Sequence, residues 1–239
     1  MTIDATELAT GLAVNEMFGP TFQGEGHSQG RIANFLRLYG CHLSCSWCDT
    51  PQTWDRRRHD PYTERRHVGA AEIFDWLRDR PTDLLVVTGG EPLLQQHALA
   101  PVLKAIREEG LASEIEVETS GTIAPDLGVV DAVTRFTVSP KLANSNLRVH
   151  QRTRAEVLRA FVRTGQANWK FVVQSIEDLN EVDALVTEFG MSPVWIMPEG
   201  SDSVTVLDRM RVLADPVLAH GWHLTSRLHI LLWENARAR

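Results

Sequence analysis

Three cysteines, Cys41, Cys45 and Cys48, lie within one stretch of eight residues. They are the only cysteines in the chain, and their spacing is C-x3-C-x2-C. Thiolates are the soft ligands that iron–sulfur clusters require, and this short spacing lets a single loop surround one cluster. Three thiolates on four irons leave one iron open to a small molecule. The pattern therefore predicts a four-iron four-sulfur (4Fe–4S) cluster with one open position.

Other interpretations of these cysteines remain open from the residues alone. A structural zinc ion requires four closed ligands, and His42 or His59 could supply the fourth. An iron–sulfur protein without catalysis is a further candidate, as is a set of buried structural cysteines. The last is a poor match, because the cysteines lie in a polar loop flanked by glycine. Bound iron with acid-labile sulfide would exclude zinc.

Apolar runs alternate with amphipathic stretches along most of the chain, which predicts a parallel sheet with helices outside. The segment 56–67 is polar and strongly basic, and we interpret it as a surface loop. The expected strands are 32–39, 84–87, 114–118, 135–138, 170–173, 194–197 and 228–233, and the expected helices are 70–80, 99–109, 155–163, 176–189 and 204–220.

Polar motifs follow several of these strands. After the cysteine loop come TGGEP, ETSG, SPK and PEG, each directly behind an expected strand. The carboxyl ends of parallel strands meet at one edge of a sheet, where α/β folds bind their ligands. We therefore expect these motifs to converge on one site. They lie at residues 88–92, 118–121, 139–141 and 198–200.

Length and charge limit the classes of function. The 239 residues suit one domain, which we place at 1–239. A net charge of −7 argues against a nucleic-acid partner. No run is long enough to span a membrane, and residues 1–12 lack the layout of a signal peptide. We therefore expect no membrane partner and a cytoplasmic location.

The cysteine motif, with Trp47 before its last cysteine and GGEP one strand later, resembles the radical S-adenosylmethionine (SAM) superfamily. The resemblance implies that the open iron chelates the amino and carboxylate groups of SAM. One electron from the reduced cluster then cleaves the sulfonium to give methionine and a 5′-deoxyadenosyl radical. Gly90 and Glu91 match the motif for the amino group of SAM, and glycine permits close backbone approach.

The segment before the cysteines resembles one particular family within this superfamily. Residues 16–26 (EMFGPTFQGEG) are similar to a signature of the 7-carboxy-7-deazaguanine synthase family. Arg37, four residues before the first cysteine, and Thr88 match further motifs of that family. So do residues 48–50 (CDT) and 139–141 (SPK), with a weaker match at 197–200. The matches span most of the chain.

This resemblance implies conversion of 6-carboxy-5,6,7,8-tetrahydropterin to 7-carboxy-7-deazaguanine with loss of ammonia, on the route to the tRNA base queuosine. The radical would take the hydrogen at C6 and be regenerated from the product. We assign no acid–base residue. The substrate contacts implied are Phe22, Gln23, Gly24, Arg37 and Thr88. The SAM contacts implied are Trp47, Cys48, Asp49, Gly90, Glu91, Ser139, Pro140, Lys141, Met197, Pro198 and Glu199.

The resemblance also implies a Mg²⁺ ion, with the Thr50 hydroxyl as a protein ligand, because Mg²⁺ takes hard oxygen ligands. It implies an electron donor of the flavodoxin or ferredoxin class, and a homodimer. The expected fold is an incomplete (β/α) barrel of about six parallel strands with the site at its open mouth. The alternative function is a glycyl-radical-enzyme activase, which shares the cysteine spacing but acts on a partner protein.

The C-terminal tail departs from the family pattern. In some members a chain-terminal carboxylate reaches the substrate, whereas this chain ends in a basic stretch with Arg237 and Arg239. We therefore assign no tail residue to the site. His223 and His229 could substitute for that carboxylate, but a lone histidine is more often structural.

Overall fold

The computed structural model describes residues 11–234 and 236–238. In this part of the chain nine strands join in one sheet, in the order β3-β1-β2-β4-β5-β6-β7-β8-β9. The predictions of a cytoplasmic location and of a single domain over residues 1–239 also involve residues 1–10, 235 and 239. These residues lie outside the described part of the chain. The strands are β1 (Leu12–Phe22), β2 (Ile32–Leu38), β3 (Arg66–Val68), β4 (Leu84–Gly89), β5 (Glu114–Thr119), β6 (Arg135–Val138), β7 (Ala167–Val173), β8 (Val194–Pro198) and β9 (His223–Leu224).

The sheet is open and mostly parallel. Strands β2, β4, β5, β6, β7, β8 and β9 are neighbours in this order, and each runs parallel to the next. Strand β1 pairs antiparallel with both β2 and β3. The last strand, β9, has only two residues, so six longer parallel strands form the body of the sheet. This confirms the predicted incomplete barrel of about six parallel strands.

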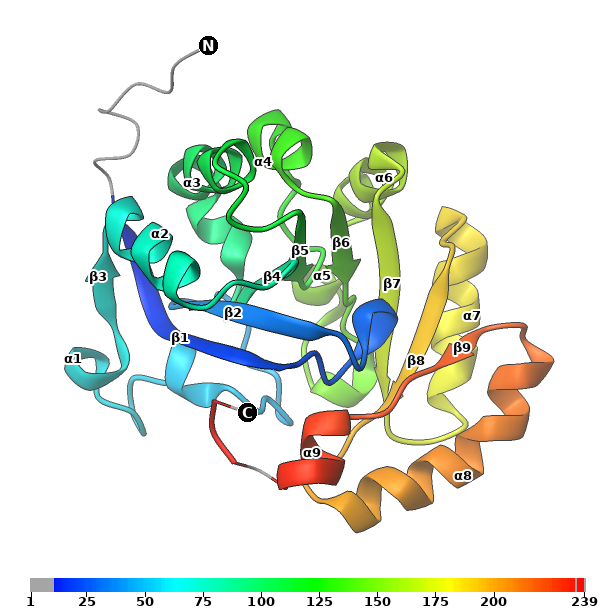
Figure 1. Ribbon diagram of the computed structural model, residues 1–239. Coiled ribbons are helices and arrows are strands. Elements are labelled where there is room, and N and C mark those ends of the chain that lie inside the picture. Colours follow the sequence, from blue (N-terminus) through cyan, green and yellow to red (C-terminus); the bar gives the residue numbers. More distant parts are fainter. Residues whose placement is uncertain (1–10, 235, 239) are drawn as a thin grey trace.

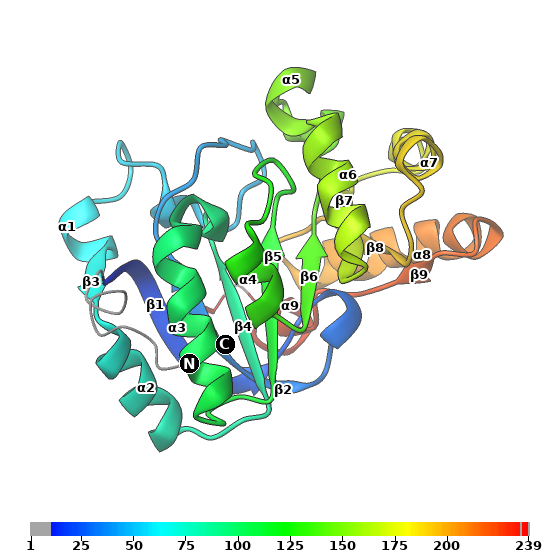
Figure 2. The same ribbon diagram turned by 90° about the horizontal axis from the view of Figure 1, so that it is seen from above.

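The longer helices lie along the outer side of the curved sheet, as Figures 1 and 2 show. None of the helices in the described residues is long and apolar enough to cross a membrane. The helices are α1 (Pro61–Glu64), α2 (Ala70–Asp79), α3 (Gln96–Glu108), α4 (Leu127–Ala132), α5 (Val149–Arg152), α6 (Ala155–Thr164), α7 (Asp178–Phe189), α8 (Ser203–Ala219) and α9 (Leu228–Trp233), with short 3-10 turns at Gly26–Ser28, Pro51–Thr53, Pro92–Gln95 and Ala143–Ser145.

The two faces of the sheet differ in chemistry. Along β5, Ile115 and Val117 belong to the apolar core under the outer helices, whereas Glu116 and Glu118 alternate with them on the other face. Successive side chains of a strand point to opposite faces, so this alternation separates the two environments. Parallel strands covered on both sides are usually apolar throughout. The charged inner face therefore indicates a functional interior.

Two predictions about the elements are wrong, and one long strand was not predicted. Residues 228–233, expected as a strand, form helix α9, because β9 already occupies the edge of the sheet beside β8. A short apolar run does not distinguish helix from strand. Part of the segment 56–67 forms α1 and begins β3. Strand β1 was not expected, because its glycine and proline residues interrupt the alternating pattern.

Candidate active site

A cavity of about 210 Å³ opens at the carboxyl ends of the parallel strands. The cysteine loop and the ends of β4, β5, β6 and β8 contribute to its wall, as the post-strand motifs predict. Fifteen of the nineteen predicted site residues line it, whereas Glu91, Pro140, Pro198 and Glu199 do not. The fifteen are Phe22, Gln23, Gly24, Arg37, Cys41, Cys45, Trp47, Cys48, Asp49, Thr50, Thr88, Gly90, Ser139, Lys141 and Met197.

All three cysteine side chains lie in this one cavity and are half-buried. Burial raises the pKa of the Cys41 thiol to about 12 and also raises the pKa of Cys45. Such thiols would be protonated in an empty site, whereas iron favours the thiolate. Three soft ligands on one loop, with no fourth, fit a cluster that keeps an open iron.

Hydrogen bonds fix the shape of the cysteine loop. The Trp54 indole N–H donates to the Cys48 sulfur at 3.3 Å, and the Trp47 indole donates to the Asn144 amide oxygen at 3.1 Å. The ammonium of Lys141 lies 5.5 Å from the centre of the Trp47 ring. The loop is thus positioned by contacts from Trp54 within the loop region and from Asn144 and Lys141 after β6.

The glycine pair after β4 allows the chain to pass very close to the cysteine loop. A Cβ on Gly90 would lie 2.2 Å from the Gly40 carbonyl oxygen and 2.8 Å from the Cys41 Cβ. Gly89 has φ +143, a conformation that L side chains rarely adopt. The cavity therefore exposes backbone next to a cluster ligand, which fits the predicted contact with the amino group of SAM.

Glu91 has a structural role in the described residues. Its carboxylate is buried and accepts hydrogen bonds from Leu93 N–H, the Thr119 hydroxyl and both the N–H and hydroxyl of Ser120. The Glu91 backbone N–H donates to the Gly40 carbonyl oxygen at 2.8 Å. The side chain thus holds the turn after β4 against the end of β5. The Glu199 carboxylate is similarly occupied, by Arg209.

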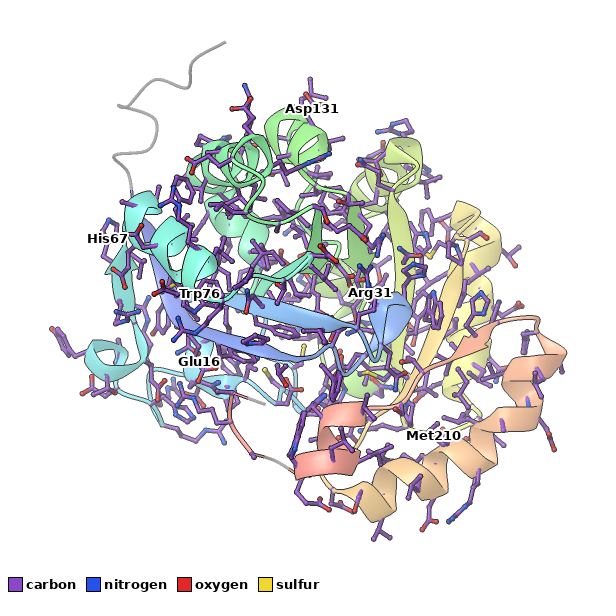
Figure 3. All side chains as sticks on the ribbon, in the orientation of Figure 1. Glu16, Arg31, His67, Trp76, Asp131 and Met210 are labelled. Atoms are coloured by element: carbon purple, nitrogen blue, oxygen red, sulfur yellow. The ribbon has the colours of Figure 1, made fainter. Side chains whose placement is uncertain are left out.

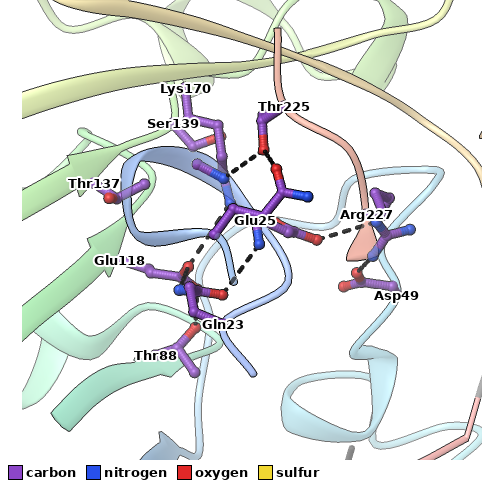
Figure 4. A network of polar contacts seen from close by, with 12 residues as sticks. Gln23, Glu25, Asp49, Thr88, Glu118, Thr137, Ser139, Lys170, Thr225 and Arg227 are labelled. Carbon is purple, nitrogen blue, oxygen red and sulfur yellow. Dashed lines mark hydrogen bonds and ion pairs between the residues drawn. The ribbon is translucent and has the colours of Figure 1, made fainter. Parts of the chain in front are cut away.

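A buried network of charged and polar side chains lies along one wall of the cavity (Figure 4). The Lys170 ammonium donates to the Glu25 carboxylate at 2.5 Å and lies 3.8 Å from Glu118. Burial would raise the pKa of Glu25, but the charges of Lys170, Arg227 and His229 outweigh it and hold that pKa far below its ordinary value. Glu25 and Lys170 are therefore a charged pair.

Arg227 joins three segments around the cavity. Its guanidinium donates to Glu25 at 3.0 Å, to the Gly200 carbonyl at 2.5 Å and to the carboxylate of Asp49, next to Cys48 (Figure 4). The side chain is almost fully buried. It therefore ties the cysteine loop to the end of β8 and to the segment after β1.

The Glu118 carboxylate is the centre of a second polar group. It accepts from the Gln23 amide at 3.1 Å and from the Thr88 hydroxyl at 2.7 Å. A carboxylate has about four acceptor sites, so Glu118 can accept further N–H donors. The predicted substrate residues Gln23 and Thr88 thus meet on a carboxylate that the sequence reasoning did not assign.

Arg37 lies beside Thr88 in the paired strands β2 and β4. Its Nε donates to Glu16 at 3.2 Å, and its guanidinium lies 5.4 Å from the centre of the Phe18 ring. Among the described residues, its two terminal nitrogens make no hydrogen bond to protein. They are available to hold a carboxylate in the forked geometry that arginine favours.

Helix α9 covers the mouth. Leu228 N–H donates to the Gly24 carbonyl at 2.8 Å, and His229 packs so closely that a Cβ on Gly24 would lie 2.0 Å from its Nδ1. Trp233 stacks on Phe22 with ring centres 6.3 Å apart. Of the two histidines that could substitute for a terminal carboxylate, His229 lines the cavity and His223 does not.

Sequence reasoning missed several residues of this site. Lys170 is a charged residue in a strand whose residues are all buried, and Glu118 is the last of three glutamates at alternate positions of β5. A charge in a strand that helices should cover is the signal that could have identified both. Arg227 and Trp54 carry no comparable local signal.

The open parallel sheet, the three thiols in one cavity at its carboxyl edge and the exposed backbone beside them define a radical SAM enzyme. A model of a 4Fe-4S single cluster domain matches residues 22–159, which favours iron and sulfide over zinc. SuiB from Streptococcus suis, solved bound to S-adenosylmethionine, shares the fold with a TM-score of 0.54 at 17% identity, over 79% of this chain and 47% of that one.

Closer relatives identify the family. A 7-carboxy-7-deazaguanine synthase from Pyrobaculum aerophilum is 34% identical over 230 residues, covering 95% of this chain and 96% of the relative. The one from Escherichia coli K12 is 31% identical, covering 90% and 96%. The crystal structure of QueE from Escherichia coli matches with a TM-score of 0.71 and 25% identity, over 95% of this chain and 100% of that one. This chain belongs to the 7-carboxy-7-deazaguanine synthase family, and the activase alternative is the less supported one.

Proposed function

We propose that this protein converts 6-carboxy-5,6,7,8-tetrahydropterin to 7-carboxy-7-deazaguanine with loss of ammonia. The observation that carries the proposal is the content of one cavity. Three thiols of a cluster-binding loop and a set of groups suited to a pterin carboxylate line the same 210 Å³ space. Family membership supports the reaction, because the relatives bear this activity in their names.

Cys41, Cys45 and Cys48 would hold the cluster, and residues at the ends of β4, β6 and β8 would hold SAM. These are Gly90, Ser139, Lys141 and Met197 of the cavity wall. When bound, the cluster and SAM together supply a radical that abstracts hydrogen from carbon. The chain contributes the binding and orientation of both molecules and the exclusion of water by α9.

The substrate would lie between Arg37 and Glu118. Arg37 offers its two terminal nitrogens to the substrate carboxylate, with Glu16 fixing the orientation of the guanidinium. Glu118, held by Gln23 and Thr88, would accept N–H groups of the pterin ring. Phe22, stacked on Trp233, would close the mouth over the flat ring.

Further assignments extend the proposal. Thr50 lines the cavity with its hydroxyl 3.8 Å from the Cys48 sulfur, a position suited to a Mg²⁺ ion that also binds the substrate carboxylate. An electron carrier of the flavodoxin or ferredoxin class would reduce the cluster. We further propose a homodimer of single-domain chains that act in the cytoplasm, in the pathway to queuosine.

An anaerobic assay tests the proposal. The reconstituted protein is reduced with dithionite and given SAM, Mg²⁺ and the carboxytetrahydropterin, and products are followed by mass spectrometry. We expect 7-carboxy-7-deazaguanine, and its absence despite formation of 5′-deoxyadenosine would refute the substrate assignment. A parallel sample without Mg²⁺ tests the ion separately, with slower turnover expected.

A further inference from the structure

The basic segment, residues 56–67 (RRRHDPYTERRH), has no part in the proposed function. It carries five arginines and two carboxylates in a chain whose net charge is −7. His67, at its end, lies at the outer edge of the molecule in Figure 3. A local concentration of positive charge on a negative protein creates a field that selects partners of opposite sign.

Three arginines of the basic segment are available to such a partner. Arg56, Arg57 and Arg65 are exposed, and none of them forms an ion pair within residues 11–234 and 236–238. The other two arginines of the segment are neutralised by neighbouring carboxylates, and one carboxylate of the segment is neutralised by an arginine. These pairs are Arg58–Asp55, Arg66–Glu72 and Arg237–Glu64.

The basic segment is attached directly to the cluster-binding loop. Trp54, two residues before Arg56, donates its indole N–H to the sulfur of the ligand Cys48. The Arg56 backbone N–H donates in turn to the Trp54 carbonyl oxygen at 3.0 Å. Just before Trp54, the Thr53 carbonyl oxygen accepts from the N–H of Gly40, the residue that precedes Cys41, at 2.9 Å. Arg56 and Arg57, at the start of the basic segment, therefore directly follow residues that contact the cysteine loop, whereas the other end of the segment continues into α1 and β3. A partner bound at Arg56 and Arg57 would face the cysteine-loop end of the segment.

An exposed aromatic residue lies within the same segment. Tyr62 on α1 is 95% exposed, and its backbone is fixed by the Asp60 carboxylate, which accepts from Tyr62 N–H at 2.9 Å. Tyrosine and arginine are the residue types that most often anchor protein interfaces. The segment thus offers both charge and an anchor for a protein partner.

We propose that the basic segment is the docking surface for an acidic one-electron carrier protein. The inference rests on the proposed function, because an oxidised cluster needs an external electron before it can cleave SAM. One electron passes from the reduced carrier to the cluster, so that the carrier is oxidised and the cluster reduced, with no bond formed or broken. Electron transfer slows steeply with distance, and docking beside Trp54 keeps this distance short.

Stopped-flow reduction of the reconstituted cluster tests the inference. Reduced flavodoxin, an acidic carrier, is mixed with the SAM-bound native protein, with Arg56→Glu/Arg57→Glu, or with Arg107→Glu/Arg163→Glu. The last is a matched control, with two exposed arginines on α3 and α6 reversed. We expect the second-order rate constant to fall about tenfold at low ionic strength for the first variant only, and its salt dependence to weaken.

The readout needs no pterin, so failure of the proposed reaction leaves this test intact. Reduction by dithionite should be equal in all three proteins. Three outcomes would overturn the inference: an unchanged rate with flavodoxin in Arg56→Glu/Arg57→Glu, an equal fall in the control variant, or an equal fall with dithionite. Failure of flavodoxin to reduce the native cluster would also overturn it.

Discussion

Replacing Cys45 by alanine is expected to abolish both cluster binding and turnover. Cys45 supplies one of three thiols in the cavity, and the sequence has no fourth cysteine to take its place. Without the cluster there is no route to the radical chemistry, so the rate should fall to the uncatalysed level, a loss of at least about 10⁶-fold. Iron and sulfide content, together with the assay for 5′-deoxyadenosine, measures both effects.

The neighbouring variant Ser46→Ala is the matched control. Ser46 is exposed in the same loop, and its hydroxyl makes only a long hydrogen bond of 3.4 Å to the Asn144 carbonyl. It should retain the cluster and the native rate. If Cys45→Ala bound a full complement of iron and sulfide and still cleaved SAM, the assignment of the three thiols as cluster ligands would be wrong.

Replacing Arg37 by alanine should separate the two halves of the reaction. Among the described residues, the Arg37 side chain hydrogen-bonds to Glu16 and to no cysteine, so the cluster and the slow reductive cleavage of SAM should persist. Loss of a largely buried cation that binds the substrate carboxylate should lower kcat/KM for the pterin by about 100- to 1,000-fold. The measurement is the ratio of 7-carboxy-7-deazaguanine to 5′-deoxyadenosine formed in the same samples.

Two further variants make this result specific to the carboxylate. Arg37→Lys keeps the charge but not the fork, so it should recover only part of the lost kcat/KM. Arg31→Ala removes an arginine at the start of β2 whose guanidinium is bound by Glu114 outside the cavity, and it should turn over normally. Normal turnover by Arg37→Ala would rule out the carboxylate role.

Most of the parallel sheet could be predicted from the sequence because its strands are short apolar or alternating runs, most of which a polar motif follows. The rule that such motifs converge at one edge of a parallel sheet then brought the cysteines, Thr88 and Ser139 into one cavity. Local pattern sufficed there. It failed for residues 228–233, where the neighbourhood of β9 rather than the apolar composition decides between strand and helix.

The charged interior could not be predicted in the same way. Lys170 and Glu25 are 145 residues apart, and Arg227 and Asp49 are 178 apart, so no local pattern connects either pair. A buried charge is stable only with a partner, but the sequence does not say which partner the fold supplies. Glu91 shows the converse, because its motif indicates a cofactor contact whereas its carboxylate serves the turn.

The most direct test of the account is the fate of the hydrogen at C6 of the substrate. The protein is supplied with carboxytetrahydropterin that carries deuterium at C6, and the adenosyl group of recovered SAM and 5′-deoxyadenosine is analysed by mass spectrometry. The account predicts deuterium in that group together with 7-carboxy-7-deazaguanine, and neither in Cys45→Ala. Formation of 7-carboxy-7-deazaguanine with an unlabelled adenosyl group would contradict it.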